Sequence, residues 1–142
     1  MAGRQEVRRH VRLAKGFMET AEIRDNSDEF QVRNALSRSY YGLFHACHAW
    51  LATNNVPFRR RSQHETLIKE IGDRRGREFG KRLEGFWLLR KQADYDRPEF
   101  FAAKPFQGDL DKFRLSARGD QGRMAVELDS YVSDIESFME SQ

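Results

Sequence analysis

The stretch ALSRSYYGLFHACHAWLA, residues 35–52, is the most informative segment for the fold. On a helical wheel of about 100° per residue, its large apolar side chains gather on one broad face. The opposite face carries Arg38, Tyr41, His45 and His48, together with Asn34 just before the stretch. The pattern predicts a long helix that buries one face in a core and brings polar side chains together on the other.

The rest of the chain also shows helical periodicity. Only three prolines occur in 142 residues, which leaves room for long helices. Apolar residues recur at alternating spacings of four and three in segments 7–21 and 124–138, and segment 79–93 carries another apolar stripe. No segment alternates as a half-buried strand does. We therefore predict an all-α protein, an up-and-down bundle of four to five helices in a single domain spanning residues 1–142.

Local signals predict several helix ends. Ser27 is a candidate N-cap for the helix of the opening stretch, which we expect to reach about Asn54. Ser62 and Glu65 form a capping-box pattern that opens a short helix, and Gly72 is expected to end it. The conformation of residues 101–122 stays open, because glycines interrupt that segment and Asp109 is a candidate cap for a further short helix.

The composition indicates a soluble cytoplasmic protein. A single cysteine, Cys47, excludes an internal disulfide and fits a reducing compartment. No apolar run is long enough for a membrane span, and the first residues do not resemble a secretory leader. We therefore expect a cytoplasmic location and no contact with a membrane.

Positive charge is clustered rather than high overall. The chain has 25 Lys and Arg against 22 Asp and Glu, a net charge of only +3. Three consecutive arginines, Arg59, Arg60 and Arg61, form a cluster that suits a polyanion such as RNA. An ordinary solvated surface would account for the cluster equally well.

The polar face of the opening stretch is a candidate active site. A histidine with an ordinary pKa near 6.5 exchanges protons at cellular pH, and an arginine binds a phosphate with two hydrogen bonds. Arg38 and His45 lie seven residues apart, about two turns, and point the same way. They therefore suit metal-independent cleavage of RNA. A buried histidine bonded to Tyr41 and an arginine that merely packs would give the same sequence.

The residues beside this polar face are small. Gly42, Ala49 and Ala52 would let another backbone approach closely, and one interpretation is that two protomers meet here across a two-fold axis. Two Arg38–His45 sets would then share one groove in a homodimer. A metal is not expected, because His45 and His48 share their face with no carboxylate. No cofactor is expected either.

Three segments in order resemble the HEPN domains, in particular their small stand-alone bacterial and archaeal branch. They are NALSRSYYGLFHACHAWL (34–51), SQHETL (62–67) and LLRKQADYD (88–96), and the resemblance covers roughly residues 5–97. It implies a dimerising helical bundle and the R-x(4–6)-H motif of HEPN ribonucleases, here Arg38, six residues and His45. It also implies a toxin whose antitoxin is a minimal nucleotidyltransferase. Cys47 occupies the position at which some of these toxins carry a tyrosine that the partner modifies.

Together these observations predict a dimeric endoribonuclease in which Arg38 stabilises the phosphate and His45 is the acid or base. Asn34, Tyr41 and His48 would line the site, and Arg59, Arg60 and Arg61 would guide RNA toward it. Arg90 and Asp94, four residues apart, are expected to form a structural ion pair. The alternative is a non-catalytic module that binds a nucleotide, RNA or a nucleotidyltransferase. A structural adaptor that uses the polar face only to dimerise is the third possibility.

Overall fold

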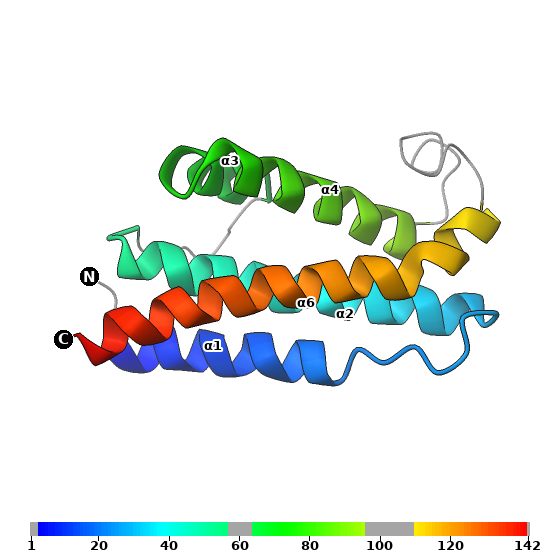
Figure 1. The fold of residues 1–142 in the computed structure, drawn as a ribbon, viewed down its shortest axis with the longest axis horizontal. Helices are drawn as coiled ribbons and strands as arrows, with labels where there is room; N and C mark the ends of the chain where they lie inside the picture. Colours follow the sequence, from blue (N-terminus) through cyan, green and yellow to red (C-terminus); the bar gives the residue numbers. More distant parts are fainter. Residues whose placement is uncertain (1–2, 57–63, 96–109, 142) are drawn as a thin grey trace.

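The computed structural model describes residues 3–56, 64–95 and 110–141. These ranges hold helices and connecting turns and no strand, so the predicted all-α class is confirmed. The helices are α1 (Arg4–Glu19), α2 (Glu29–Thr53), α3 (His64–Arg74), α4 (Arg77–Asp94) and α6 (Leu110–Glu140). Figure 1 shows α2 and α6 side by side, with α1 on one side of this pair and α3 and α4 on the other.

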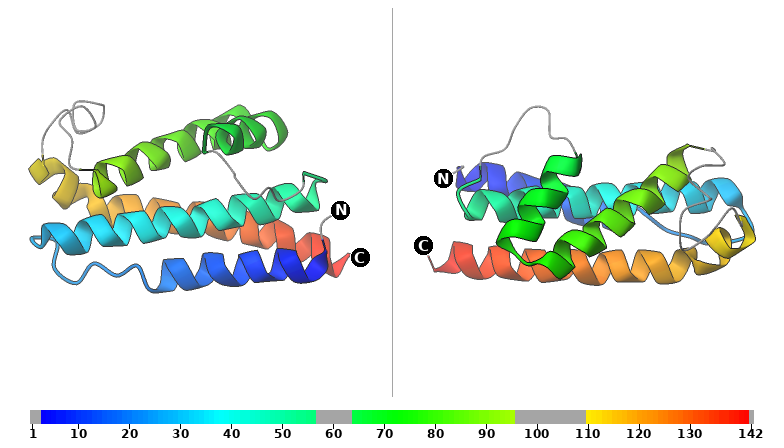
Figure 2. Two further views of the ribbon diagram at one scale, coloured as in Figure 1. Left: turned by 180° about the vertical axis from the view of Figure 1, so that it is seen from behind. Right: turned by 90° about the horizontal axis from the view of Figure 1, so that it is seen from above.

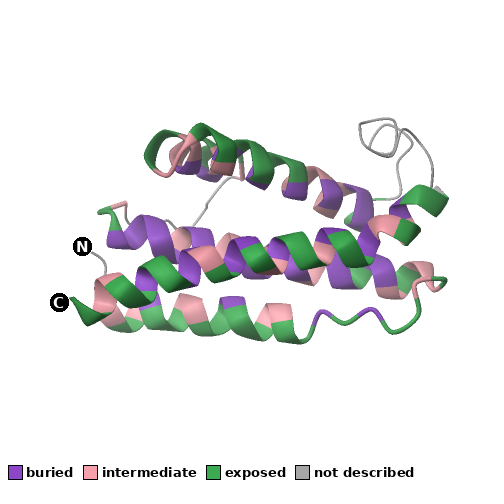
Figure 3. Cartoon of the chain, viewed as in Figure 1, coloured by how far each residue is buried: buried purple, intermediate pink, exposed green. Residues whose placement is uncertain are grey.

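Helix α2 is the centre of the bundle because it contacts α1, α3, α4 and α6. Its N-cap is Asp28, whose carboxylate accepts hydrogen bonds from the backbone N–H groups of Phe30 and Gln31. The predicted cap at Ser27 is therefore wrong by one residue, because Ser27 instead bonds to the side chain of Asp25. The predicted helix end near Asn54 matches the C-cap. Most of α2 is buried, as its purple colour in Figure 3 shows.

Helix α1 runs antiparallel to α2 and lies very close to it. A Cβ atom added to Gly42 would lie 2.8 Å from the backbone oxygen of Ala14, so the two backbones meet where α2 has no side chain. Gly42 is fully enclosed within one chain, and Ala49 and Ala52 are buried as well. Gly42 therefore admits α1. Because all three small residues are buried within one chain, they are not contacts to a second protomer, and that interpretation of them is corrected.

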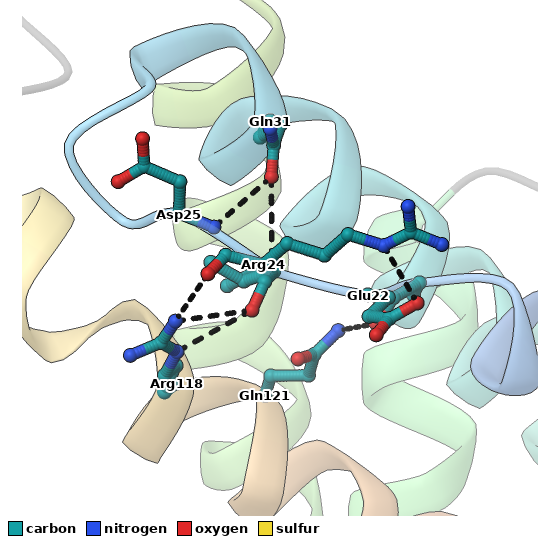
Figure 4. A network of polar contacts seen from close by, with 8 residues as sticks. Glu22, Arg24, Asp25, Gln31, Arg118 and Gln121 are labelled. Carbon is teal, nitrogen blue, oxygen red and sulfur yellow. Dashed lines mark hydrogen bonds and ion pairs between the residues drawn. The ribbon is translucent and has the colours of Figure 1, made fainter.

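The connection between α1 and α2 is held against α6 by hydrogen bonds (Figure 4). Arg118 donates to the backbone oxygens of Ile23 and Arg24, at 3.2 and 2.9 Å. Gln121 donates to the backbone oxygen of Ala21 and to Ser39 of α2. These contacts fix the C-terminal end of α1 beside the first turns of α2, where Thr20 meets Arg38.

Helices α3 and α4 form a pair that crosses one side of the bundle (Figure 2). The prediction that Gly72 ends α3 is wrong, since the helix continues to Arg74. Gly72 is instead a packing position, because a Cβ atom on Gly80 of α4 would lie 2.9 Å from its Cα. The turn between the helices falls at Gly76, whose φ of 133° is readily adopted only by glycine. The Ser62 cap lies outside the described residues.

Helix α6 has 31 residues and spans the whole bundle. The predicted last helix over 124–138 is thus extended toward the N-terminus to Leu110, through a segment whose conformation the sequence left open. Gly119 and Gly122 lie within it, so the packing of buried residues on one face outweighs their low helix propensity. The buried residues of that face include Phe113, Ala117, Met124, Leu128, Tyr131 and Ile135.

Candidate functional site

The candidate site lies between α1 and the polar face of α2. Because the helices are antiparallel and close at Gly42, residues near the end of α1 meet the first half of α2 and earlier residues meet the second half. Arg38 of α2 thus faces Thr20, and His45 faces His10. Phe17 lies between these two contacts and touches both Arg38 and His45.

Arg38 is half-buried and directed at α1. Its Nε atom donates a hydrogen bond of 3.1 Å to Oγ1 of Thr20. Its guanidinium carbon lies 5.5 Å from the centre of the Phe17 ring, a cation–π distance. The hydrogen bond to Thr20 and the ring of Phe17 orient the guanidinium. That hydrogen bond uses one of the five N–H donors of Arg38, and the other four are the donors that would bind a phosphate.

The imidazole of His45 contacts the rings of Phe17, Phe44 and His10. Its imidazole stacks on Phe17 with ring centres 5.6 Å apart, and Phe44 meets it edge-on at 5.7 Å. Its Nδ1 atom lies 3.1 Å from Nδ1 of His10. Burial lowers the pKa of His45 to about 4, and His10 adds to the effect. At pH 7 His45 is therefore neutral, the form in which a histidine accepts a proton.

His48 extends the polar face by one turn. It packs edge-on against Phe44, with ring centres 4.6 Å apart. Burial lowers its pKa to about 4, and His10, His45 and His64 contribute. Asn34 lies at the other end of the face and is exposed, one turn before Arg38. The structure thus places His48 close to His45 and leaves Asn34 on the rim.

The hydroxyl group of Tyr41 forms a hydrogen bond with α4 rather than with Arg38 or His45. Its hydroxyl oxygen accepts a hydrogen bond of 2.6 Å from Nη2 of Arg90. Arg90 also pairs with Asp94, with 2.8 Å between Nε and Oδ2, and both side chains are largely buried. Tyr41 and the Arg90–Asp94 ion pair therefore connect the polar face of α2 to α4. Tyr95, the next residue, lies under the same guanidinium.

A cluster of side chains around His64, which the sequence did not predict, joins α2, α3 and α4. Nδ1 of His64 lies 2.7 Å from the hydroxyl oxygen of Tyr40, and its ring stacks on Trp87 at 5.7 Å. Lys91 also contacts Trp87, with its Nζ atom 3.5 Å from the centre of the Trp87 ring. Burial, Arg90 and Lys91 lower the pKa of His64. The cluster holds α3 against the α2–α4 pair.

Two residues that follow the proposed catalytic pair in sequence point away from it. Ser39 is fully buried and accepts a hydrogen bond of 3.0 Å from Gln121 of α6. Cys47 is fully buried, and burial raises the pKa of its thiol. Neither belongs to the candidate site. Arg59, Arg60 and Arg61 lie outside the described residues, so their role remains a prediction.

Sequence reasoning missed the contribution of α1. His10, Phe17 and Thr20 complete the surroundings of Arg38 and His45, yet none was a candidate. A signal was present in the spacing, because His10 and Phe17 are seven residues apart, as are Arg38 and His45. That spacing places each pair on one side of its helix, but it does not show which helices face each other.

The lowered histidine pKa values predict a pH-dependent stability. The unfolded chain takes up protons on His45 and His48 near pH 6.5, whereas the folded chain does so only near pH 4. The unfolded state therefore binds more protons between these values, and the free energy of unfolding decreases as pH falls from about 6.5 to about 4. Urea unfolding at a series of pH values measures this slope. A His48→Gln variant should show a shallower slope, and an unchanged slope would contradict the assignment of His48.

The comparisons with known proteins leave the site to be interpreted from its own geometry. No protein-family model matches the chain, and no curated protein sequence matches it. Within residues 3–56, 64–95 and 110–141, no three His, Cys, Asp or Glu side chains are grouped as a metal site would require. None of the helices in these ranges is both long and apolar enough to cross a membrane.

Proposed function

We propose that this protein is a metal-independent endoribonuclease of HEPN type that acts as a homodimer. One observation carries the proposal: Arg38 and His45 project from one face of α2 and pack against the same ring, Phe17, at 5.5 and 5.6 Å. A fixed positive charge and a neutral imidazole thereby both lie against the ring of Phe17. These are the two groups that cleavage of an RNA phosphodiester needs.

The proposed reaction begins with His45 as the base. It takes the proton of a ribose 2′-hydroxyl while the 2′ oxygen attacks the adjacent phosphorus. Arg38 stabilises the negative charge that develops on the phosphate oxygens. The bond from phosphorus to the 5′ oxygen breaks, and His45 of a second protomer gives a proton to that oxygen. The negative charge of the bound phosphate favours the protonated form of this second histidine. The products are a 2′,3′-cyclic phosphate and a 5′-hydroxyl.

Exposed arginines on α1 support a polyanionic substrate. Arg8, Arg9 and Arg12 are exposed and line a surface hollow of about 680 Å³. Arg9 is adjacent to His10, so the positive surface begins beside the candidate site. Such a surface attracts nucleic acid through its phosphates with little sequence preference. The role as a toxin, with a nucleotidyltransferase as antitoxin, rests on the sequence resemblance alone.

The test is RNA cleavage by the purified protein in EDTA, with analysis of the new ends. We expect cuts that leave a 2′,3′-cyclic phosphate. A matched RNA with 2′-O-methyl groups at the cut positions should resist, because it lacks the attacking hydroxyl. A His45→Ala preparation purified in parallel controls for contaminating nucleases. Failure of the folded protein to cut a range of RNAs would refute the proposal.

A non-catalytic binding module is the second candidate, and one observation favours it. Arg38 and His45 each already have a partner in the same chain, Thr20 and His10. Residues that only shape a binding surface would be held in this way. This candidate predicts that RNA or a nucleotide binds without being cleaved, and that Arg38→Ala weakens the binding. Filter binding with the same RNAs distinguishes it from the ribonuclease.

A further inference from the structure

His10 of α1 is the closest polar partner of His45 and was not expected at the site. The two Nδ1 atoms are 3.1 Å apart, with ring centres at 5.3 Å and ring planes inclined by 36°. A hydrogen bond between two imidazole nitrogens requires a proton on one of them and a lone pair on the other. The contact therefore couples the protonation of one ring to that of the other.

The other neighbours of His45 fix its ring position without affecting its protons. Phe17 stacks on one side at an angle of 6°, and Phe44 closes a second side nearly at right angles. Neither phenyl ring has a nitrogen or oxygen atom that could take a proton from the imidazole. In the described part of the chain, His10 is thus the side chain placed to choose which nitrogen of His45 carries the proton.

Both rings are neutral at pH 7, so each carries one N–H proton. In the hydrogen bond between them, only one of the two Nδ1 atoms carries its proton. Burial lowers the pKa of His10, and the charge of Arg9 adds to this, while burial and His10 act on His45. If His45 donates, its Nε2 atom keeps a lone pair and is a base. If His10 donates, Nε2 of His45 carries the proton and cannot act as one.

We propose that His10 is a positioning residue that accepts the Nδ1 proton of His45 in a hydrogen bond and so leaves Nε2 of His45 basic. This inference rests on the proposed ribonuclease function. When Nε2 takes the proton of the ribose hydroxyl, the Nδ1 proton passes to His10. His45 is then neutral with its proton on Nε2, and His10 is the imidazolium. One protomer can in this way hold the abstracted proton without a charge on His45.

Two substitutions separate the hydrogen bond from the volume of the ring. His10→Phe keeps an aromatic ring but removes the acceptor nitrogen. His10→Asn places an amide oxygen near the former Nδ1 position and keeps an acceptor. We expect His10→Phe to lower kcat at least about 10-fold, the size of the loss seen when a metal-ligating histidine loses its hydrogen-bond partner. His10→Asn should retain most of the activity.

Nitrogen NMR of the histidine rings gives a readout that does not depend on cleavage. In the wild-type protein, His45 should carry its proton on Nδ1, and His10→Asn should keep it there. In His10→Phe the proton should move to Nε2. The acid limb of the pH–rate profile should also shift upward, because removal of His10 takes away one cause of the low pKa of His45. The other charged or titratable neighbours, Arg9, Arg38 and His48, are unchanged in both variants.

The outcomes distinguish the two proposals. If wild-type protein shows the Nδ1 proton on His45 but cuts no RNA, the ribonuclease proposal fails and the histidine contact stands. If wild-type protein cuts RNA while His45 carries its proton on Nε2, the role given to His10 is overturned. That measurement needs only the wild-type chain, so it decides the matter even if His10→Phe does not fold.

Discussion

His45→Ala is expected to lose RNA cleavage by at least about 100-fold, the usual contribution of a general base. The loss follows because His45 is the imidazole that stacks on Phe17, the ring that Arg38 also contacts. His45 is only half-buried, so the variant should keep its fold. Single-turnover cleavage with a labelled RNA measures the effect.

Added imidazole is the control for this prediction. The side chain removed from His45→Ala leaves a space between Phe17 and Phe44, and free imidazole should enter it and restore part of the rate. Circular dichroism and thermal unfolding should match the wild-type protein closely. Cleavage by His45→Ala at the wild-type rate would show that another residue is the base and would remove the main support for the proposed mechanism.

Gly42→Ala is expected to lower the free energy of unfolding by about 2–3 kcal/mol, at the upper end of the cost of overpacking. The added methyl group would lie 2.8 Å from the backbone oxygen of Ala14, and neither helix backbone can move aside cheaply. Separation of α1 from α2 would also draw His10 away from His45. Urea unfolding measures the stability, and the cleavage assay measures the effect on the site.

Gly85→Ala is the matched control, since it adds the same methyl group to a glycine within α4. Nothing lies within 4 Å of the position of the new Cβ. We expect this variant to gain about 0.5–1 kcal/mol, because alanine favours the helix. Equal stability of the two variants would contradict the close packing of α1 on α2.

The local features of the fold were largely predictable from the sequence. The spacing of apolar residues predicts helices α1, α2 and α4, because an amphipathic helix places such residues three and four positions apart. The common face of Arg38, Tyr41, His45 and His48 follows from helix geometry alone. The cap of α2 was misplaced by one residue because Ser27 and Asp28 are both good caps, and only the fold selects between them.

Long-range features were not predictable in the same way. Gly72 has the signature of a helix end, yet it serves the close contact of α3 with α4. Gly119 and Gly122 suggested a break, yet the buried stripe of α6 keeps them in one helix. In each case a tertiary contact outweighs a local preference of about 1 kcal/mol.

Residue spacing alone was enough to predict long amphipathic helices, one of which carries an arginine and four further polar side chains on a single face. This holds because a helical repeat fixes directions around its own axis. The packing of the helices was needed to show that α1 covers this face, with His10 beside His45 and Thr20 beside Arg38. The register of two packed helices depends on which surfaces fit, here the backbone of α1 against Gly42, and no repeat within either helix contains that information.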